Sequence, residues 1–218
     1  MIEWTYATMW VATATYFFHA QTNKLWLGRL ATALLLITEG GLTAGLVQRS
    51  LMAGHWPLTS RYEFSLCFTW AILMTYFLLE VSWRERRAGH YILSIALMVM
   101  TYAVTRPSNE KALSPLLPVL RTVWLQLHVL TAAIGYGALG VAAGLGWRQL
   151  RRSFLEKREP PAERPAIITG EHLAATQAQD TNPHAGSVFP SSTDVGITME
   201  RVVALGFPWL TLSILIGA

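Results

Sequence analysis

Apolar residues in this chain gather in long blocks that are separated by short polar connections. A helix needs roughly 20 apolar residues to cross the ~30 Å hydrocarbon core of a bilayer. No alternation of apolar and polar residues typical of a strand competes with this pattern. The blocks predict an all-α, polytopic membrane helix bundle with about six transmembrane helices, at Trp4–His19, Leu25–Val47, Phe64–Trp83, Tyr91–Val104, Val119–Trp147 and Val202–Ala218.

The composition agrees with a membrane protein. Of the 218 residues, 52% are hydrophobic and 14% are charged, whereas a soluble domain has roughly a quarter of charged residues. Cys67 is the only cysteine, which excludes an internal disulfide and a CxxC redox pair. The N-terminus lacks the basic region and cleavage site of a secretory signal peptide, so we expect residues 1–20 to be retained as a helix.

Basic residues indicate how the bundle is oriented. Of the 17 Lys and Arg residues, 12 fall near the connections after the first, third and fifth predicted spans. These connections share one side of the membrane, and Lys and Arg are enriched on the cytoplasmic side. We therefore expect an external N-terminus and Arg-rich connections in the cytoplasm or the plastid stroma. Because the net charge of +4 is distributed in this way, it indicates no nucleic-acid partner.

The connection between the fifth and sixth predicted spans has a different composition. It is rich in Pro, Ser, Thr, Gln and Asp and poor in apolar residues. Such a segment cannot bury enough apolar surface to offset the entropy lost on ordering it. We therefore expect a five-helix membrane domain at 1–152, a disordered cytoplasmic loop at 153–198, and a sixth transmembrane helix at 199–218.

Small residues recur at a spacing of three or four residues in the second and fifth predicted spans. This spacing lets helix backbones approach closely in lipid. We therefore expect helix contacts at Gly41, Gly45, Ala133, Gly137, Gly140 and Gly144.

Two ionisable residues fall inside predicted spans. His128 lies roughly 10–14 Å below the external start of the fifth span, and Glu39 lies in the outer half of the second. An ionisable group at such a depth is a functional candidate, and neutral imidazole is a good iron ligand. The alternative is that both residues have a structural role. In that case His128 forms a hydrogen bond to a neighbouring helix, and Glu39 is protonated or paired. The residues alone leave these alternatives open.

Further candidates lie in the external segment before the third span. His55 belongs to Gly54-His55-Trp56-Pro57, and Glu63 falls in the first helical turn, where the helix dipole favours a carboxylate. Arg61 offers a guanidinium that can bind a haem propionate in bidentate fashion.

Several other chemistries find no support in the sequence. It contains no Walker loop, dinucleotide fingerprint, HExxH or GxSxG in a suitable context. No second histidine lies at the depth of His128 on another span. A bis-histidine haem site of the ordinary b-type cytochromes is therefore not expected from this chain alone.

Three segments together resemble the cytochrome c assembly proteins of the CcsA/ResC type. Ala53–Trp70 resembles their GHxP-x-S-N-x-YES-x-x-F stretch, and Leu117–Val129 resembles their P-x-L-x-S-x-W-L-x-x-H-V segment. Ala204–Leu212 resembles the GFPLLTLG helix that precedes their tryptophan-rich WWD region. The order and spacing of the segments agree as well, and the resemblance covers essentially the whole chain.

This resemblance implies a function in cytochrome c biogenesis. The resemblance implies that the chain binds haem b and delivers it for covalent attachment to the CxxCH motif of apocytochrome c, together with a ResB-type membrane partner. The haem site is expected on the external (periplasmic or lumenal) side of a bacterial plasma membrane or thylakoid. His128 corresponds to a histidine that ligates the haem iron in the family. The other candidates for haem binding are Trp124, Glu63, Arg61, Tyr62 and His55.

The chain also departs from the family pattern. Ser60 stands where the family has Asn, and Phe64 where Ser follows the glutamate. Residues 216–218 lie where the WWD region, with a second histidine beyond it, is expected to begin. We therefore expect a fragment or one piece of a split gene, at most part of a holocytochrome c synthase and inactive alone. A transporter with Glu39 and His128 on its path and a scaffold subunit remain the alternatives.

Overall fold

Every secondary-structure element in the described part of the chain is a helix. The computed structural model describes residues 2–58, 60–83, 86–112, 122–156 and 192–217. The all-α bundle predicted from the apolar blocks is confirmed. Its elements are α1 (Ile2–Thr22), α2 (Leu25–Ala53), α3 (Arg61–Trp83), the 3-10 helix η1 (Arg86–Ala88), α4 (Gly89–Val104), α5 (Ser108–Lys111), α6 (Val123–Glu156) and α8 (Ser192–Gly217).

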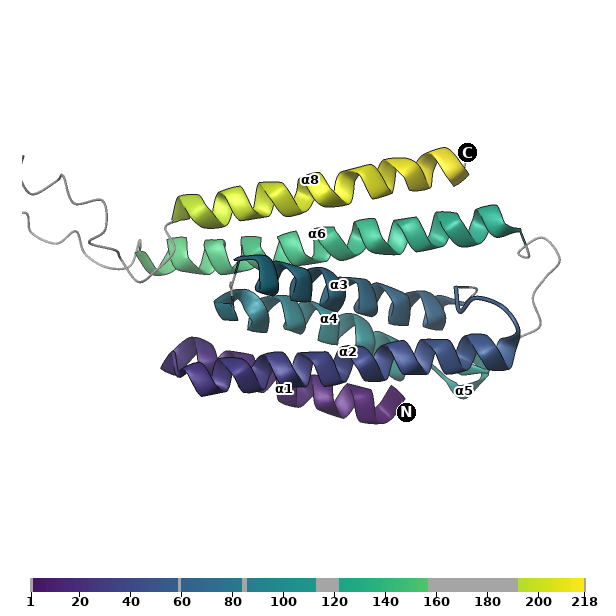
Figure 1. Cartoon of the computed structure of the whole chain (residues 1–218), viewed down its shortest axis with the longest axis horizontal. Helices are drawn as coiled ribbons and strands as arrows, with labels where there is room; N and C mark the ends of the chain where they lie inside the picture. The colour runs from purple at the N-terminus through teal and green to yellow at the C-terminus, as the bar shows by residue number, and fades with distance from the viewer. Residues whose placement is uncertain (1, 59, 84–85, 113–121, 157–191, 218) are drawn as a thin grey trace, which may run out of the picture.

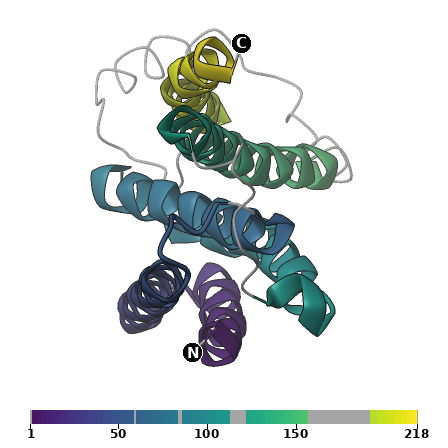
Figure 2. The same cartoon turned by 90° about the vertical axis from the view of Figure 1, so that its right-hand side faces the viewer.

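The long helices lie side by side along one common direction, with α3 near the centre of the stack (Figure 1). α3 packs against α2, α4 and α6, and α1 packs against α2 and α4. α8 packs against α6 on the outer side of the bundle, as the view along the helices shows (Figure 2). Helices that are distant in sequence therefore share one core.

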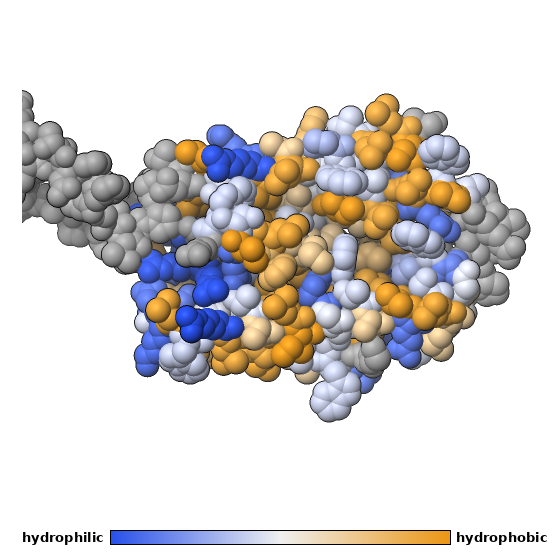
Figure 3. All heavy atoms as spheres, viewed as in Figure 1, coloured by the Kyte–Doolittle hydropathy of each residue, from blue (hydrophilic) through white to orange (hydrophobic). Residues whose placement is uncertain are grey.

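Apolar side chains fill the interior and also cover much of the outside. Leu66, Leu73 and Tyr76 of α3 are fully buried in the core, while Met98 is 70% and Leu215 is 72% exposed. On the visible face, hydrophobic residues spread over the middle and toward the right, and hydrophilic residues gather mainly at the left end (Figure 3). Helices that are apolar on both their inner and outer faces are typical of a bundle surrounded by lipid.

Five helical segments of the described chain are long and apolar enough to cross a membrane: 25–53, 61–83, 86–104, 123–155 and 195–217. The first predicted span also folds as a long helix, α1, which contains five threonines, Glu3 and His19 and is not among the five segments above. At 1.5 Å per residue α1 is about 30 Å long, and it runs antiparallel to α2 (Figure 1). The chain is thus an integral membrane protein in which α1 is the sixth long helix.

The small residues lie at close helix contacts, as predicted. A Cβ atom added to Gly137 would lie 2.7 Å from the Cβ atom of Ala71, and one added to Gly144 would lie 2.6 Å from Cγ1 of Ile92. Gly41 of α2 approaches α1 at a similar distance. These contacts join α6 to α3 and α4, and α2 to α1.

The segment predicted as a loop at 153–198 is helical at both ends. α6 continues to Glu156, and α8 begins at Ser192. The remainder of that prediction, 157–191, lies outside the described residues.

Glu80 forms a buried polar cluster where α1, α2 and α3 meet. Its carboxyl group accepts hydrogen bonds from the hydroxyl groups of Tyr16 and Thr32. It also pairs with Arg86, whose Nε lies 3.0 Å from Oε1. Donors from three parts of the chain thus offset the cost of burying this carboxyl group.

We expect Tyr16→Phe to lower the free energy of unfolding by about 1–3 kcal/mol, because it removes a donor to a buried carboxyl group while keeping the ring. An SDS titration of the detergent-solubilised protein, followed by circular dichroism, measures the change. Tyr102→Phe serves as the control, since the Tyr102 side chain is 43% exposed. Equal effects of the two substitutions would show that the bond from Tyr16 contributes nothing specific.

Candidate functional site

The candidates predicted around the external loop lie at one end of the bundle, where α2 ends and α3 and α6 begin (Figure 1). The described arginines of η1 and of the last turns of α6 lie at the other end. Gly54 ends α2 with a φ of +69°, in the left-handed region that glycine adopts without strain. The chain then turns through His55–Leu58 and re-enters the bundle as α3.

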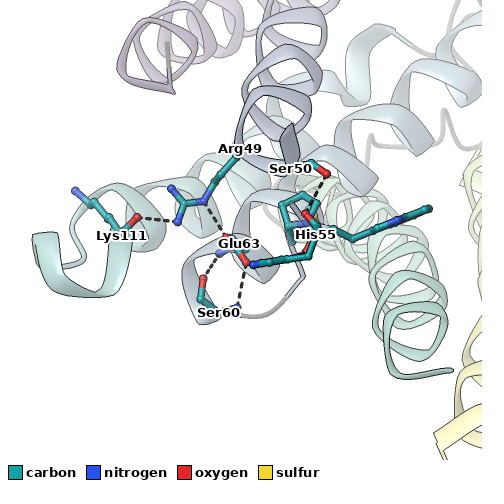
Figure 4. A network of polar contacts seen from close by, with 9 residues as sticks. Arg49, Ser50, His55, Ser60, Glu63 and Lys111 are labelled. Atoms are coloured by element: carbon teal, nitrogen blue, oxygen red, sulfur yellow. Dashed lines mark hydrogen bonds and ion pairs between the residues drawn. The ribbon is translucent and has the colours of Figure 1, made fainter. Parts of the chain in front are cut away.

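Glu63 is the centre of a polar network at this end (Figure 4). Its Oε1 accepts a hydrogen bond from Nε of Arg49 at 2.9 Å, and its side chain is 3% exposed. The backbone amide of Ser60 donates to Oε2 of Glu63 at 3.3 Å, and the amide of Glu63 donates to Oγ of Ser60 at 3.1 Å. This reciprocal pair is a capping box, which fixes the start of α3.

Arg49 extends the network to α5. Its Nη2 donates to the carbonyl oxygen of Lys111 at 2.7 Å, and its guanidinium lies 4.9 Å from the ring centre of Tyr62. Arg49 and Lys111 are not among the residues that the sequence predicts for this site. Arg61, which is predicted, is exposed at the start of α3. The ionic partner of Glu63 is therefore an arginine of the preceding helix.

The loop after α2 closes over an apolar hollow between α2, α3 and α6. Oγ of Ser50 donates to the carbonyl oxygen of His55 at 3.0 Å, and Sγ of Cys67 donates to that of Pro57 at 3.4 Å. Nδ1 of His55 donates to the carbonyl oxygen of Trp56 at 2.9 Å. The hollow has a volume of about 310 Å³ and is lined mainly by apolar side chains. It is a pocket for an apolar group, and Trp56, Pro57 and Leu58 of the loop line it.

His128 lies on α6 and is bonded to α8. Nδ1 of His128 lies 2.7 Å from the carbonyl oxygen of Ser213 and 3.1 Å from its Oγ, which in turn donates to the carbonyl oxygen of His128 at 3.0 Å. Because a carbonyl oxygen only accepts, Nδ1 carries the proton in this arrangement. The lone pair of Nε2 then remains available, and within the described residues no hydrogen bond engages it.

His128 lies closer to the helix start than predicted. α6 begins at Val123 within the described residues, which places His128 about 7–8 Å along the helix rather than 10–14 Å. The predicted span began at Val119, and residues 113–121 lie outside the described part of the chain. The imidazole is thus near the mouth of the bundle.

A groove of about 360 Å³ runs beside His128 between α3, α6 and α8. Apart from His128 and Ser213, its lining is apolar or aromatic: Phe64, Val129, Ala132, Tyr136, Leu210 and Ile214. Phe64 directly follows Glu63, so the capping box also positions one wall of this groove. A neutral imidazole nitrogen beside apolar walls suits a flat, largely apolar ligand that carries a metal ion.

The other predicted residues are only partly brought together. Trp124 is 68% exposed one turn before His128. Glu39 is buried on the face of α2 that packs in the bundle, and neither of its carboxyl oxygens has a hydrogen-bond partner among the described residues. No cluster of three or more His, Cys, Asp or Glu suited to a metal ion occurs in the described part of the chain.

Comparison with known proteins gives a consistent result. Residues 58–218 match the family described as Cytochrome C assembly protein. A protein of Gloeobacter violaceus named Cytochrome c biogenesis protein CcsA is 28% identical over 98% of this chain and 72% of its own length. Proteins of the same name from a Synechococcus strain and from Prochlorococcus marinus are 34% and 31% identical, over 81% and 87% of this chain.

The alignments with these last two relatives span 58% and 61% of their length. The family match includes the capping box at the start of α3, His128 on α6 and Ser213 on α8. It covers well over half of the chain. This chain therefore belongs to the cytochrome c assembly protein family.

Proposed function

We propose that this chain takes part in cytochrome c assembly by binding haem b through Nε2 of His128 and holding it for attachment to apocytochrome c. The observation that supports this best is the hydrogen bond from Nδ1 of His128 to the carbonyl oxygen of Ser213. Such a bond on the far nitrogen fixes the tautomer and orientation of a metal-ligating histidine.

The surroundings of His128 support the same proposal. The apolar groove offers contact to the face of a macrocycle, and Phe64 and Tyr136 supply aromatic walls. Arg61 is exposed at the same end of the bundle, where it can reach a propionate. Trp124, one turn before His128, is 68% exposed and so is accessible to a partner protein.

The distribution of charge supports an external site. The described arginines of η1 and of the last turns of α6 lie at the end of the bundle opposite to His128, and Lys and Arg are enriched on the cytoplasmic side, so we propose that His128 lies on the external side, periplasmic or lumenal. Apocytochrome c presents its CxxCH thiols there, and a ResB-type protein would be the membrane partner. Haem supplies the vinyl groups to which the thiols add, and this chain's part is to hold and orient it.

The alternatives are less well supported. A transporter would need Glu39 and His128 on one path, yet Glu39 lies on the inner face of α2 and His128 between α6 and α8. A scaffold subunit would use the bond between His128 and Ser213 only for packing. These alternatives predict no haem spectrum that depends on His128.

An absorption titration of the detergent-purified chain with haem tests the proposal. We expect a Soret band that His128→Ala weakens by about tenfold or more in affinity, because the iron loses its protein ligand. Added imidazole should restore the band, since it can occupy the space left by the side chain.

His90→Ala is the control, because His90 lies at the opposite end of the bundle, in the first turn of α4. It should leave the titration unchanged. A band that persists in His128→Ala, or that His90→Ala reduces equally, would contradict the assignment and favour the scaffold. Circular dichroism of each variant confirms that the bundle is intact.

A further inference from the structure

The last turns of α8 form a surface against which the imidazole of His128 packs. α8 runs antiparallel to α6, so that its C-terminal end lies beside the start of α6 (Figure 1). Close contacts follow one line along the two helices: His128 with Gly217, Gly135 with Leu210, and Ala138 with Gly206. Residue numbers rise along α6 as they fall along α8, so these contacts define one register between the helices.

Gly217 leaves the space that the imidazole ring occupies. A Cβ atom added to Gly217 would lie 2.5 Å from Nδ1, 2.6 Å from Cε1 and 3.3 Å from Cγ of His128. The first two distances are far shorter than the separation at which non-bonded atoms attract one another. The ring can rotate away about its side-chain bonds, whereas the backbone of α8 is held by its other contacts with α6. A side chain at position 217 would therefore displace the ring.

The position of the ring against Gly217 brings Nδ1 to two acceptors of one residue. Nδ1 of His128 lies 2.7 Å from the carbonyl oxygen of Ser213 and 3.1 Å from its Oγ. Oγ of Ser213 donates its own proton to the carbonyl oxygen of His128 at 3.0 Å, so it presents a lone pair to Nδ1. Ser213 is 3% exposed, so little water reaches these acceptors. A ring displaced from Gly217 would lose both of them.

The hydrogen bond at Nδ1 also affects how strongly Nε2 binds a metal ion. A histidine that donates its other N–H to a carbonyl oxygen is a more basic ligand and binds metal more tightly. Hydrogen bonds to the axial ligand are among the features by which a protein sets the reduction potential of haem. A more basic ligand stabilises ferric iron more than ferrous iron, and it therefore lowers this potential.

We propose that Gly217 is a positioning residue of the haem site, because it admits the imidazole of His128 to the carbonyl oxygen of Ser213 and so sets the tautomer, the haem affinity and the reduction potential. The part of this inference that concerns haem rests on the function proposed above. The part that concerns the tautomer does not, since the hydrogen bond belongs to the chain itself.

Nitrogen NMR of the detergent-purified chain, labelled with nitrogen-15 histidine and prepared without haem, tests the tautomer. We expect the signals that His128→Ala removes to show a protonated Nδ1 and an unprotonated Nε2. Gly217→Ala should shift His128 toward the opposite tautomer, because Nδ1 loses its acceptors. Gly196→Ala is the matched control, because it adds the same methyl group to the same helix where nothing lies within 4 Å of the new Cβ atom. It should leave the signals unchanged.

A redox titration of the haem-loaded chain tests the effect on the site. Gly217→Ala should weaken haem affinity by about tenfold or more and move the midpoint potential to a more positive value, because Nδ1 no longer donates to a carbonyl oxygen. Ser213→Ala keeps that carbonyl oxygen and should move the potential less, in the same direction. Gly196→Ala should change neither quantity.

The outcomes separate this inference from the function proposed above. A wild-type chain that shows the expected tautomer but binds no haem through His128 would contradict the function and leave the role of Gly217 in the tautomer intact. Haem bound through His128, with tautomer and potential unchanged in Gly217→Ala, would overturn the inference and leave the function intact. Circular dichroism shows whether Gly217→Ala folds. If it does not, a His128 protonated on Nε2 in the wild-type chain is sufficient to overturn the inference.

Discussion

Replacing Glu63 by alanine is expected to lower the free energy of unfolding by about 3–5 kcal/mol, because it leaves the guanidinium of Arg49 without its ionic partner in a partly buried site. The two side chains are 3% and 16% exposed, and 2.9 Å separates Nε of Arg49 from Oε1 of Glu63. The substitution also removes the acceptor for the amide of Ser60 at the start of α3.

An SDS titration of the purified protein measures this loss. Glu110→Ala is the matched control, because Glu110 also pairs with an arginine, Arg106, but at 3.6 Å and with side chains 25% and 35% exposed. Pairs of that kind contribute about 0–1 kcal/mol. The double variant Arg49→Leu/Glu63→Leu should lose less than the sum of the single losses, since no unpaired charge remains. Similar losses for Glu63→Ala and Glu110→Ala would show that the capping network does not hold α3 in place.

This network also shows where prediction from sequence stops. Glu63 is recognisable as a helix-start carboxylate from its local pattern alone. The ionic partner of Glu63 cannot be recognised in this way, because the hydropathy of α2 does not indicate which face of α2 packs against α3. Arg61 is the nearest arginine in sequence, but residues two apart on a helix point in different directions. Arg49 is the last charged residue of a long apolar block. A charge in that position is the feature of the sequence that could have indicated the ion pair with Glu63.

The helices themselves are predictable for a different reason. Crossing lipid requires that each backbone polar group be bonded within its own helix, so long apolar blocks have few alternatives. The exact ends are less constrained, as α6 shows by continuing to Glu156. α1 resembles the other spans in length but contains more threonine, and its hydroxyl groups bond back to the helix backbone, as Thr13 does to Met9 at 2.8 Å.

His128 is partly predictable from the sequence: more so than the partner of Glu63, and less so than the helices. Its isolation in an apolar block marks it as a candidate, and the family pattern assigns it a ligand role that stays a prediction. The partner that orients it, Ser213, lies 85 residues later in the chain. Only the packing of α8 on α6 brings the two together, through close contacts such as that of Gly206 with Ala138. A single sequence carries no information on that register.

Gly137→Ala is expected to be the most destabilising of the glycine-to-alanine changes against α3, lowering the free energy of unfolding by about 1–3 kcal/mol. The added Cβ atom would lie 2.7 Å from Cβ, 2.8 Å from the carbonyl carbon and 3.0 Å from the carbonyl oxygen of Ala71. Two of these three atoms belong to the backbone of α3, so no side-chain rotation relieves the overlap. α6 must move away from α3, and the contacts beside it loosen.

Gly40→Ala supplies the matched control, because a Cβ atom at Gly40 would meet nothing within 4 Å. Alanine favours a helix over glycine by about 1 kcal/mol, so this substitution should leave the stability unchanged or raise it slightly. Both variants replace glycine by alanine in a helix, so the chemical change is the same. The opposite signs of their effects on stability therefore follow only from the space available to the added Cβ atom. If SDS titration gave the same small effect for both variants, the two helices would be too loosely packed for Gly137 to set their distance, and the groove beside His128 would lack a fixed wall.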